Sequence, residues 1–218
     1  MSPLQNSTGR GAGGAGVLYW GCWKLREGEP AMATQERVYT VDDVWRLEQS
    51  PRHPTEKYYL IDGELHVKMS PNQRHSEAAS LLAHYLLSFV LPRGLGRVTV
   101  ECGYHPPGDR SCVMLPDVAF EGLPRGAQPS RSTYAPYMPD LAVEIISPTQ
   151  SWAKTRRKAR RYLRHGAALV WLIDPASETA EIWRRGSDER ETIDADGELS
   201  GGDVLPGFRL PLRQIFPQ

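Results

Sequence analysis

Two short apolar segments on either side of one basic segment constrain the fold of this chain most strongly. Residues 141–147 and 168–173 are each apolar over the length of a buried strand. The residues between them, 151–165, have helical spacing and are followed by Gly166, a residue type that favours the left-handed backbone at helix ends. A strand, a helix and a second strand in this order predict parallel pairing of the two strands.

Further elements are expected around this unit. Asp62-Gly63 separates two β-prone runs and predicts a hairpin over residues 58–67. Thr40 and Asn72 are typical helix N-cap residues, so a helix is expected to begin after each. The expected class is α/β (α+β), a mixed β-sheet flanked by helices, with an N-terminal β-hairpin. The other expected elements are strands at 97–101, 113–120 and 179–183 and a short final helix at 212–216.

The first residues of the chain differ in composition from the rest. Glycines crowd residues 9–16, and such a segment loses too much backbone entropy to order itself. It has no basic start followed by a long apolar stretch, so it does not resemble a signal peptide. We therefore expect a disordered tail at 1–33, native translation from Met32, and one domain at 34–218.

Charge and composition exclude several classes of protein. The 26 Lys and Arg residues balance the 26 Asp and Glu residues, which excludes a polybasic coat protein but not a local basic face. No apolar run reaches about 18 residues, so no membrane-spanning helix is expected. The three cysteines, Cys22, Cys102 and Cys112, form no CxxC pair, which disfavours a disulfide framework or a zinc-thiolate site. A reducing, cytoplasmic setting is expected.

Two acidic residues interrupt otherwise apolar segments. Asp117 lies within 113–120 and Glu144 within 141–147. A buried carboxylate requires a cation, a hydrogen-bond donor or a metal ion as its partner. Two acids on neighbouring strands, with a backbone carbonyl, make an all-oxygen site suited to Mg²⁺ or Mn²⁺. A purely structural role, in which Asp117 caps a strand and Glu144 pairs with an arginine, explains the pattern equally well.

The segment between the two apolar runs is strongly basic. Seven of the eleven residues from Lys154 to Arg164 are Lys or Arg, and none is acidic. Most of these side chains are expected in solvent, where they form a plausible track for phosphates. Lys158 differs, because it lies one turn before Tyr162 on the apolar stripe and therefore points toward the sheet. A lysine there can stabilise developing negative charge.

Six short motifs occur in a characteristic order. They are Tyr59-Leu-Ile-Asp-Gly-Glu-Leu65, Pro116-Asp-Val-Ala-Phe120, Pro139-Asp-Leu-Ala-Val-Glu-Ile-Ile-Ser-Pro148, Lys158-(x)3-Tyr162-(x)3-Gly166, Trp171-Leu-Ile-Asp-Pro175 and Gly201-Gly-Asp-Val-Leu-Pro-Gly-Phe208. Together they resemble the Uma2 (DUF820) family, which belongs to the restriction-endonuclease-like PD-(D/E)XK superfamily. The resemblance covers roughly residues 39–216 and implies a mixed-sheet nuclease core, metal-dependent phosphodiester hydrolysis and a bacterial source.

The resemblance assigns roles residue by residue. Asp117 and Glu144 match the two acids that, with the carbonyl of Ile145, would hold one Mg²⁺ (or Mn²⁺). Lys158 matches a lysine relocated to the helix, since Ile146 stands where the superfamily usually has its lysine. Glu64 matches a further acid near the site.

One position departs from the family pattern. Relatives often carry Asp four residues before the helical lysine, where this chain has Lys154. The substitution is expected to alter the basic face, not the metal ligands. Nucleic-acid contacts are expected from Lys154, Arg157 and Arg161. His75, which faces inward from the first turn of its helix, is more often a core residue than a functional one, and its expected contact is a phosphate or Glu64.

The expected activity is that of a metal-dependent endonuclease acting on nucleic acid, most simply DNA. A homodimer would supply the two cuts that a duplex needs. Two other functions stay open at this point. One is a nucleic-acid-binding module that keeps the fold without efficient catalysis. The other is a glycosidase that uses two acids, although the basic helix and the lysine disfavour a neutral sugar as its substrate.

Overall fold

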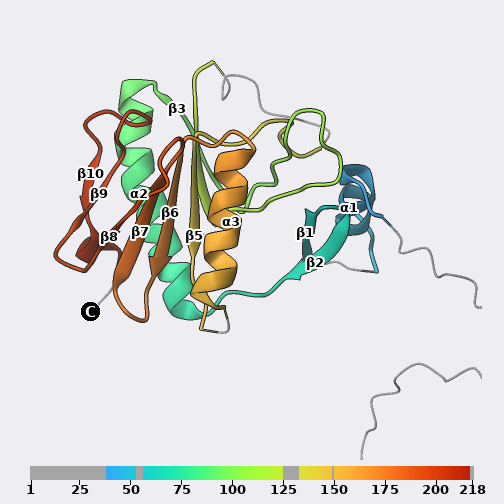
Figure 1. The fold of residues 1–218 in the computed structure, drawn as a ribbon, viewed down its shortest axis with the longest axis horizontal. Coiled ribbons are helices and arrows are strands. Elements are labelled where there is room, and N and C mark those ends of the chain that lie inside the picture. The colour runs from blue at the N-terminus through green and yellow to red at the C-terminus, as the bar shows by residue number, and fades with distance from the viewer. Residues whose placement is uncertain (1–37, 53–55, 125–132, 149, 217–218) are drawn as a thin grey trace, which may run out of the picture. The chain divides into compact units, whose positions relative to one another are not determined.

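A six-stranded mixed sheet forms the centre of the computed structural model, which describes residues 38–52, 56–124, 133–148 and 150–216 (Figure 1). The expected tail at 1–33 and start at Met32 lie outside these residues. The strand order is β3-β4-β5-β6-β7-β8. The strands are β3 (Gly96–Val100), β4 (Val118–Gly122), β5 (Leu141–Ile145), β6 (Leu169–Asp174), β7 (Thr179–Arg184) and β8 (Arg190–Ile193).

The strand–helix–strand unit adopts the predicted pairing. Strands β5 and β6 run parallel, with Leu141 opposite Leu169 and Ile145 opposite Ile173. The other ladders of this sheet, among the described residues, are antiparallel. Helix α3 (Trp152–Arg164) connects the parallel strands, beginning at the N-cap Ser151 and ending before Gly166, whose φ is 118°. The fold class expected from the sequence is therefore confirmed.

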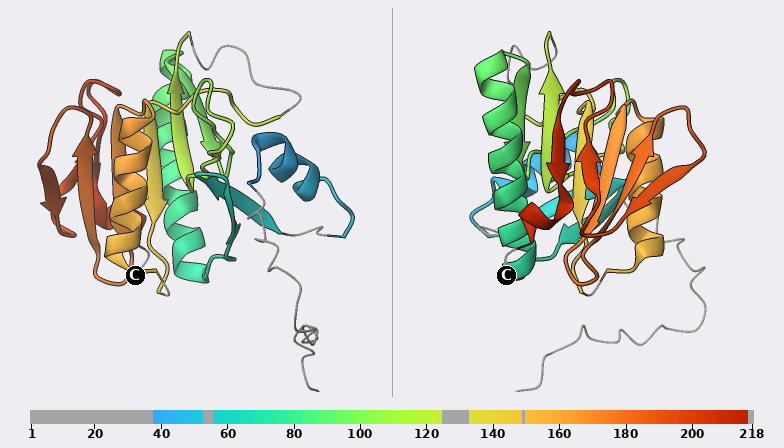
Figure 2. Two further views of the ribbon diagram at one scale, coloured as in Figure 1. Left: turned by 45° about the vertical axis from the view of Figure 1, so that its right-hand side comes forward. Right: turned by 90° about the vertical axis from the view of Figure 1, so that its left-hand side faces the viewer.

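Two helices cover opposite faces of the sheet (Figure 2). Helix α2 (Gln73–Val90) packs on the side chains of Leu141, Val143 and Ile145. Because side chains alternate along a strand, Ala142 and Glu144 of β5 point to the α3 side instead.

A hairpin and a short helix form a third hydrophobic cluster, in addition to the two on the faces of the sheet. Strands β1 (Lys57–Ile61) and β2 (Glu64–Lys68) pair in the expected register, and Asp62 and Gly63 form the turn with positive φ values of 51° and 81°. Helix α1 (Val41–Glu48) begins with a reciprocal capping box between Thr40 and Asp43. Leu60 of β1 and Val44 of α1 are fully buried in this cluster.

The strand expected at 113–120 is replaced by a bent segment. Val113 and Met114 form only isolated bridges, and β4 begins at Val118. The reason is Pro116, which has no N–H to donate to a ladder. Asp117 consequently lies just before β4 and not inside a strand.

The C-terminal part contains elements that the sequence pattern did not predict. Strand β8 extends the sheet, and β9 (Glu198–Ser200) pairs with β10 (Arg209–Pro211). The expected final helix is a 3-10 turn, η3 (Leu212–Ile215), and a similar turn, η1 (Leu91–Arg93), follows α2. Among the residues that the structure describes, no helix is both long and apolar enough to cross a membrane.

Candidate active site

Two buried carboxylates lie side by side where β4 begins and β5 ends. Asp117 and Glu144 are each 3% exposed. The backbone N–H of Asp117 binds the carbonyl of Val143, and the N–H of Ile145 donates to Asp117 Oδ2 at 2.7 Å. The residue that follows Glu144 therefore holds the side chain of Asp117. This arrangement brings together the two acids that were singled out in the sequence.

Helix α3 supplies both partners of Glu144. Lys158 Nζ lies 2.8 Å from Glu144 Oε2, and the Tyr162 hydroxyl donates to Oε1 at 2.8 Å. The two side chains are four residues apart and so share one helix face. Burial alone would lower the pKa of Lys158, but the charge of Glu144 and its hydrogen bond outweigh burial and raise that pKa. The geometry matches the inward orientation predicted for Lys158, and Tyr162 adds a polar contact to its packing role.

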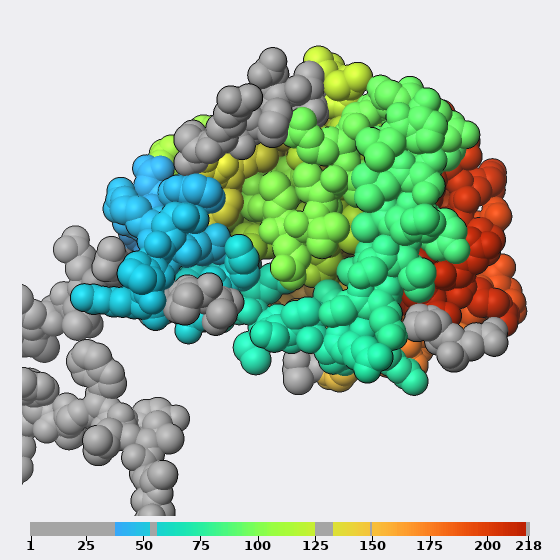
Figure 3. Space-filling model, turned by 180° about the vertical axis from the view of Figure 1, so that it is seen from behind, coloured from blue at the N-terminus to red at the C-terminus, as the bar shows by residue number. Residues whose placement is uncertain are grey.

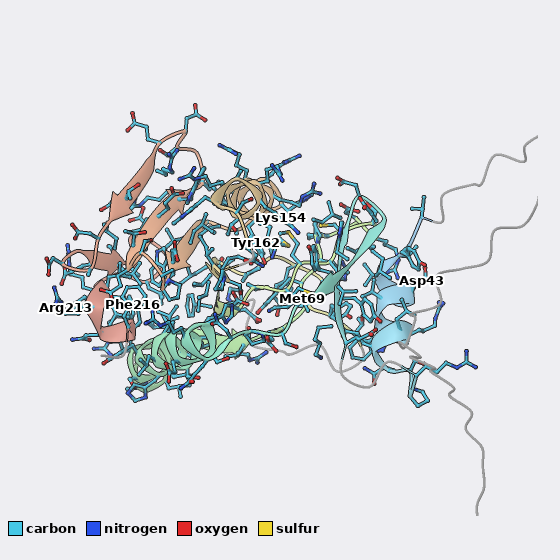
Figure 4. All side chains as sticks on the ribbon, turned by 90° about the horizontal axis from the view of Figure 1, so that it is seen from below. Asp43, Met69, Lys154, Tyr162, Arg213 and Phe216 are labelled. Atoms are coloured by element: carbon cyan, nitrogen blue, oxygen red, sulfur yellow. The ribbon has the colours of Figure 1, made fainter. Side chains whose placement is uncertain are left out.

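Asp117 has a lysine partner that the sequence analysis missed. Lys68, at the end of β2, places its Nζ 2.9 Å from Asp117 Oδ1 and 3.4 Å from Glu101 Oε1. Burial opposes the charged form of Lys68, but Asp117, Glu144 and Glu101 together raise its pKa. No local pattern in the sequence indicates this contact, because a buried acid can be satisfied by hydrogen-bond donors as well as by a cation. In Figure 4, Tyr162 on α3 and Met69, directly after Lys68, mark the elements on the two sides of this site.

His75 contacts Asp117 and not Glu64. Its Nε2 lies 3.1 Å from Asp117 Oδ2, and its ring is almost fully buried in the first turn of α2. The side chain of Asn72 caps this turn by accepting from the His75 N–H. Burial would raise the pKa of Asp117, but His75, the charge of Lys68 and the Ile145 N–H hold it well below its usual range. Asp117 is therefore ionised at neutral pH.

A pocket gives access to this group of residues. It has a volume of about 250 Å³, and Asp117, His75 and Glu101 contribute to its wall. Ser76, Ser80, Val100 and Ala79 belong to the same lining. Its lining comes from the first turns of α2 and the segments around β3 and β4, the side of the molecule seen in Figure 3. A small anion or a hydrated cation fits a space of this size.

The structure does not bring Glu64 into the site. Its side chain is 78% exposed and lies 3.7 Å from His66, and no ion pair or hydrogen bond between the described residues joins it to Asp117 or Glu144. The cause is its place beside the hairpin turn, opposite Ile61, at the other end of β2 from Lys68. Ile145 does end β5 at the site, where its carbonyl oxygen remains a proposed ligand.

The basic residues of α3 separate into paired and exposed groups. Arg161 is held by Asp62 of the hairpin turn through two bonds, at 2.8 and 3.0 Å. Lys154 and Arg157 are exposed. Of the three α3 residues predicted to bind nucleic acid, two are therefore available at the surface, and the third has an internal partner.

A second set of metal-type donors lies near the end of α3. Donor atoms of Asp109, Cys112 and His165 are all within 4.8 Å of one another. This set suits a transition metal better than Mg²⁺, which prefers oxygen. Burial and Asp109 raise the pKa of the Cys112 thiol to about 11, and its side chain is fully buried. The oxygen-rich pair Asp117 and Glu144 is the better candidate for a catalytic ion.

Comparison with known proteins places the chain in a family. The sequence model of Uma2, described as "putative restriction endonuclease", matches residues 42–213. The chain belongs to the Uma2 family. This confirms the resemblance drawn from the motifs, and the matched range of this Uma2 chain includes both acids and both lysines of the site.

A solved structure supports the same assignment. This Uma2 chain is similar to a crystal structure titled as a putative nuclease belonging to DUF820 from Anabaena variabilis ATCC 29413. The two share 25% identity with a TM-score of 0.68, over 81% of this chain and 97% of the other. A search of curated proteins gave no match. Family and neighbour together indicate a nuclease of the restriction-endonuclease-like type.

Proposed function

We propose that this protein is a metal-dependent endonuclease that hydrolyses phosphodiester bonds of nucleic acid, with DNA as its substrate. One observation carries the proposal: two buried carboxylates on adjoining segments, Asp117 and Glu144, each paired with a lysine ammonium at 2.8–2.9 Å. Buried ionised groups are costly, and Asp117, whose pKa is depressed, also lines a pocket, as is typical of active-site acids. Membership of a restriction-endonuclease family and similarity to a DUF820 nuclease structure support phosphodiester hydrolysis as the reaction of this site.

The donor set fits one Mg²⁺ or Mn²⁺ ion. Asp117 and Glu144 offer carboxylate oxygens, and Ile145 offers a carbonyl, the ligand types that these ions prefer. Such an ion would lower the pKa of a bound water and offset charge on the scissile phosphate. Lys68 and Lys158 already neutralise the two acids. A divalent ion at these acids would therefore leave the site positively charged and suited to an anionic phosphate.

The lysines act as fixed positive charges in this scheme. Glu144 raises the pKa of Lys158 and so favours its protonated ammonium form, a hydrogen-bond donor. It can donate a hydrogen bond to oxygen as negative charge develops. The Tyr162 hydroxyl donates to the second oxygen of Glu144 and so holds the orientation of this carboxylate. Lys154 and Arg157, exposed on α3, would contact flanking phosphates.

One observation favours a second candidate, a nucleic-acid-binding module without turnover. Each carboxylate oxygen of the pair has a protein partner: Lys68 and His75 for Asp117, Lys158 and Tyr162 for Glu144. An acid pair saturated in this way is stable without an ion. In such a module the two lysines would be structural counter-ions only.

A plasmid-nicking assay in Mg²⁺ or Mn²⁺ distinguishes the two candidates. Wild type should nick supercoiled DNA, and Asp117→Ala and Lys158→Ala should each abolish nicking. Arg209→Ala is the matched control, because this exposed residue pairs with Glu198 in the β9–β10 ladder region, away from the site. Linear product would indicate paired cuts, as expected of a dimer. DNA binding without nicking in either metal would favour the binding module, and nicking by both variants would refute the residue assignment.

A further inference from the structure

The ammonium of Lys68 lies between two carboxylates that come from different strands. Its distances are 2.9 Å to Asp117 Oδ1 and 3.4 Å to Glu101 Oε1. We propose that Lys68 is a resident cation that occupies a second cation position, formed by Asp117 and Glu101, and thereby limits this protein to one divalent ion. The inference rests on the proposed function, in which Asp117 and Glu144 hold that ion.

Sheet geometry creates the position. Strands β3 and β4 pair with Val100 opposite Val118, so the residues just outside this pair, Glu101 and Asp117, are also neighbours. The N–H of Glu101 donates to the carbonyl of Asp117 at 3.2 Å. Two acids fixed this close repel each other unless a cation lies between them.

The backbone of Glu101 is held in a conformation that side chains rarely adopt. Its φ is +50°, although it is not glycine. Positive φ at such a residue is unfavourable and persists where surrounding contacts impose it. Here the conformation accompanies the contact of the Glu101 carboxylate with the Lys68 ammonium.

The surroundings leave space for an ion if the lysine is shortened. Glu101, Asp117 and His75 line the pocket of about 250 Å³ beside this position. The side chain of Lys68 is 15% exposed, and that of Glu101 is 40% exposed, so water reaches the position from the Glu101 side. The charge of Glu144, whose own partner is Lys158, also acts on this position, and His75 lies on Asp117 Oδ2. Removal of the Lys68 charge would leave three acids against one lysine, an arrangement that attracts a second divalent ion.

The test counts Mn²⁺ ions bound per chain, by the loss of the free-ion EPR signal during titration. Wild type should bind one ion and Lys68→Met two. Glu101→Gln in the Lys68→Met background should restore one, and Lys68→Arg, which keeps the charge, should also bind one. Lys57→Met is the matched control, because Lys57 lies directly opposite Lys68 in the hairpin ladder and its side chain is 52% exposed.

Each outcome decides a separate point. One ion in both wild type and Lys68→Met overturns the inference and leaves the proposed function intact, as does a wild type that binds two. No ion in wild type but one in Lys68→Met supports the Lys68 position and refutes the proposed metal site at Asp117 and Glu144. No ion in either refutes both. Thermal melting checks that the variants fold, and Lys68→Gln replaces Lys68→Met if the latter melts below the assay temperature.

Discussion

Lys158 and Glu144 form a buried ion pair, with Nζ 2.8 Å from Oε2 and both side chains less than 15% exposed. Removal of one partner would leave an uncompensated charge in the core. We expect Lys158→Met to lower the free energy of unfolding by about 3 kcal/mol, the usual cost of breaking a buried pair. Urea denaturation at pH 7 measures this. A loss below about 0.5 kcal/mol would show that Glu144 has solvent access or another partner.

Tyr162→Phe removes only a hydroxyl. The change leaves Glu144 Oε1 without the bond of 2.8 Å that it accepts from this residue. We expect a loss of about 1–3 kcal/mol in unfolding free energy, the range for an unsatisfied buried acceptor. Tyr85→Phe is the control. Tyr85 lies on α2, away from the two acids, so its substitution should change stability less. Equal effects of the two substitutions would mean that the Glu144 bond contributes nothing specific.

The depressed pKa of Asp117 predicts acid sensitivity. A carboxyl whose folded-state pKa lies below its unfolded value of about 3.9 stabilises the fold at higher pH. This stability is lost as pH falls below the unfolded value toward the folded one. Unfolding free energies measured from pH 6 down to pH 2 should therefore fall less steeply for Asp117→Asn than for wild type. Parallel curves would contradict the assigned direction, whose main stabilising contacts are His75 and Lys68.

Two arginines of α3 should differ in their effect on DNA binding. Arg157 is exposed, whereas the guanidinium of Arg161 is already bound to Asp62. Loss of one phosphate contact reduces the salt slope of log K by about 1. We expect this change for Arg157→Ala and a smaller one for Arg161→Ala, measured by fluorescence anisotropy at several salt concentrations in Ca²⁺. The prediction would be wrong if Arg161→Ala had the larger effect.

Local signals were sufficient for much of this structure. The Asp62-Gly63 turn fixed the hairpin register, since its two-residue loop leaves one pairing, and the helical position of Lys158 indicated its contact with Glu144. Two apolar runs around one helix predicted the parallel pair. In each of these cases the deciding contact lies within one hairpin or one strand–helix–strand unit.

Other features depend on contacts that spacing does not encode. Lys68 meets Asp117 across 49 positions of sequence, and only the fold brings the end of β2 to the start of β4. Strand β8 has mostly exposed side chains and therefore little hydrophobic pattern. It forms by pairing with the edge of β7. Glu64 was expected near the acids from family resemblance, but its place at the hairpin turn keeps it in solvent.

Ion pairs at both ends of the β1–β2 hairpin join it to the rest of the domain. Asp62 at the turn binds Arg161, and Lys68 at the far end binds Asp117. A ligand that weakens the ion pair between Lys68 and Asp117 also weakens the binding of the hairpin to the rest of the domain. By thermodynamic reciprocity, detachment of the hairpin increases the affinity for that ligand by the same factor. Ligand binding at Asp117 and attachment of the β1–β2 hairpin are thus coupled equilibria.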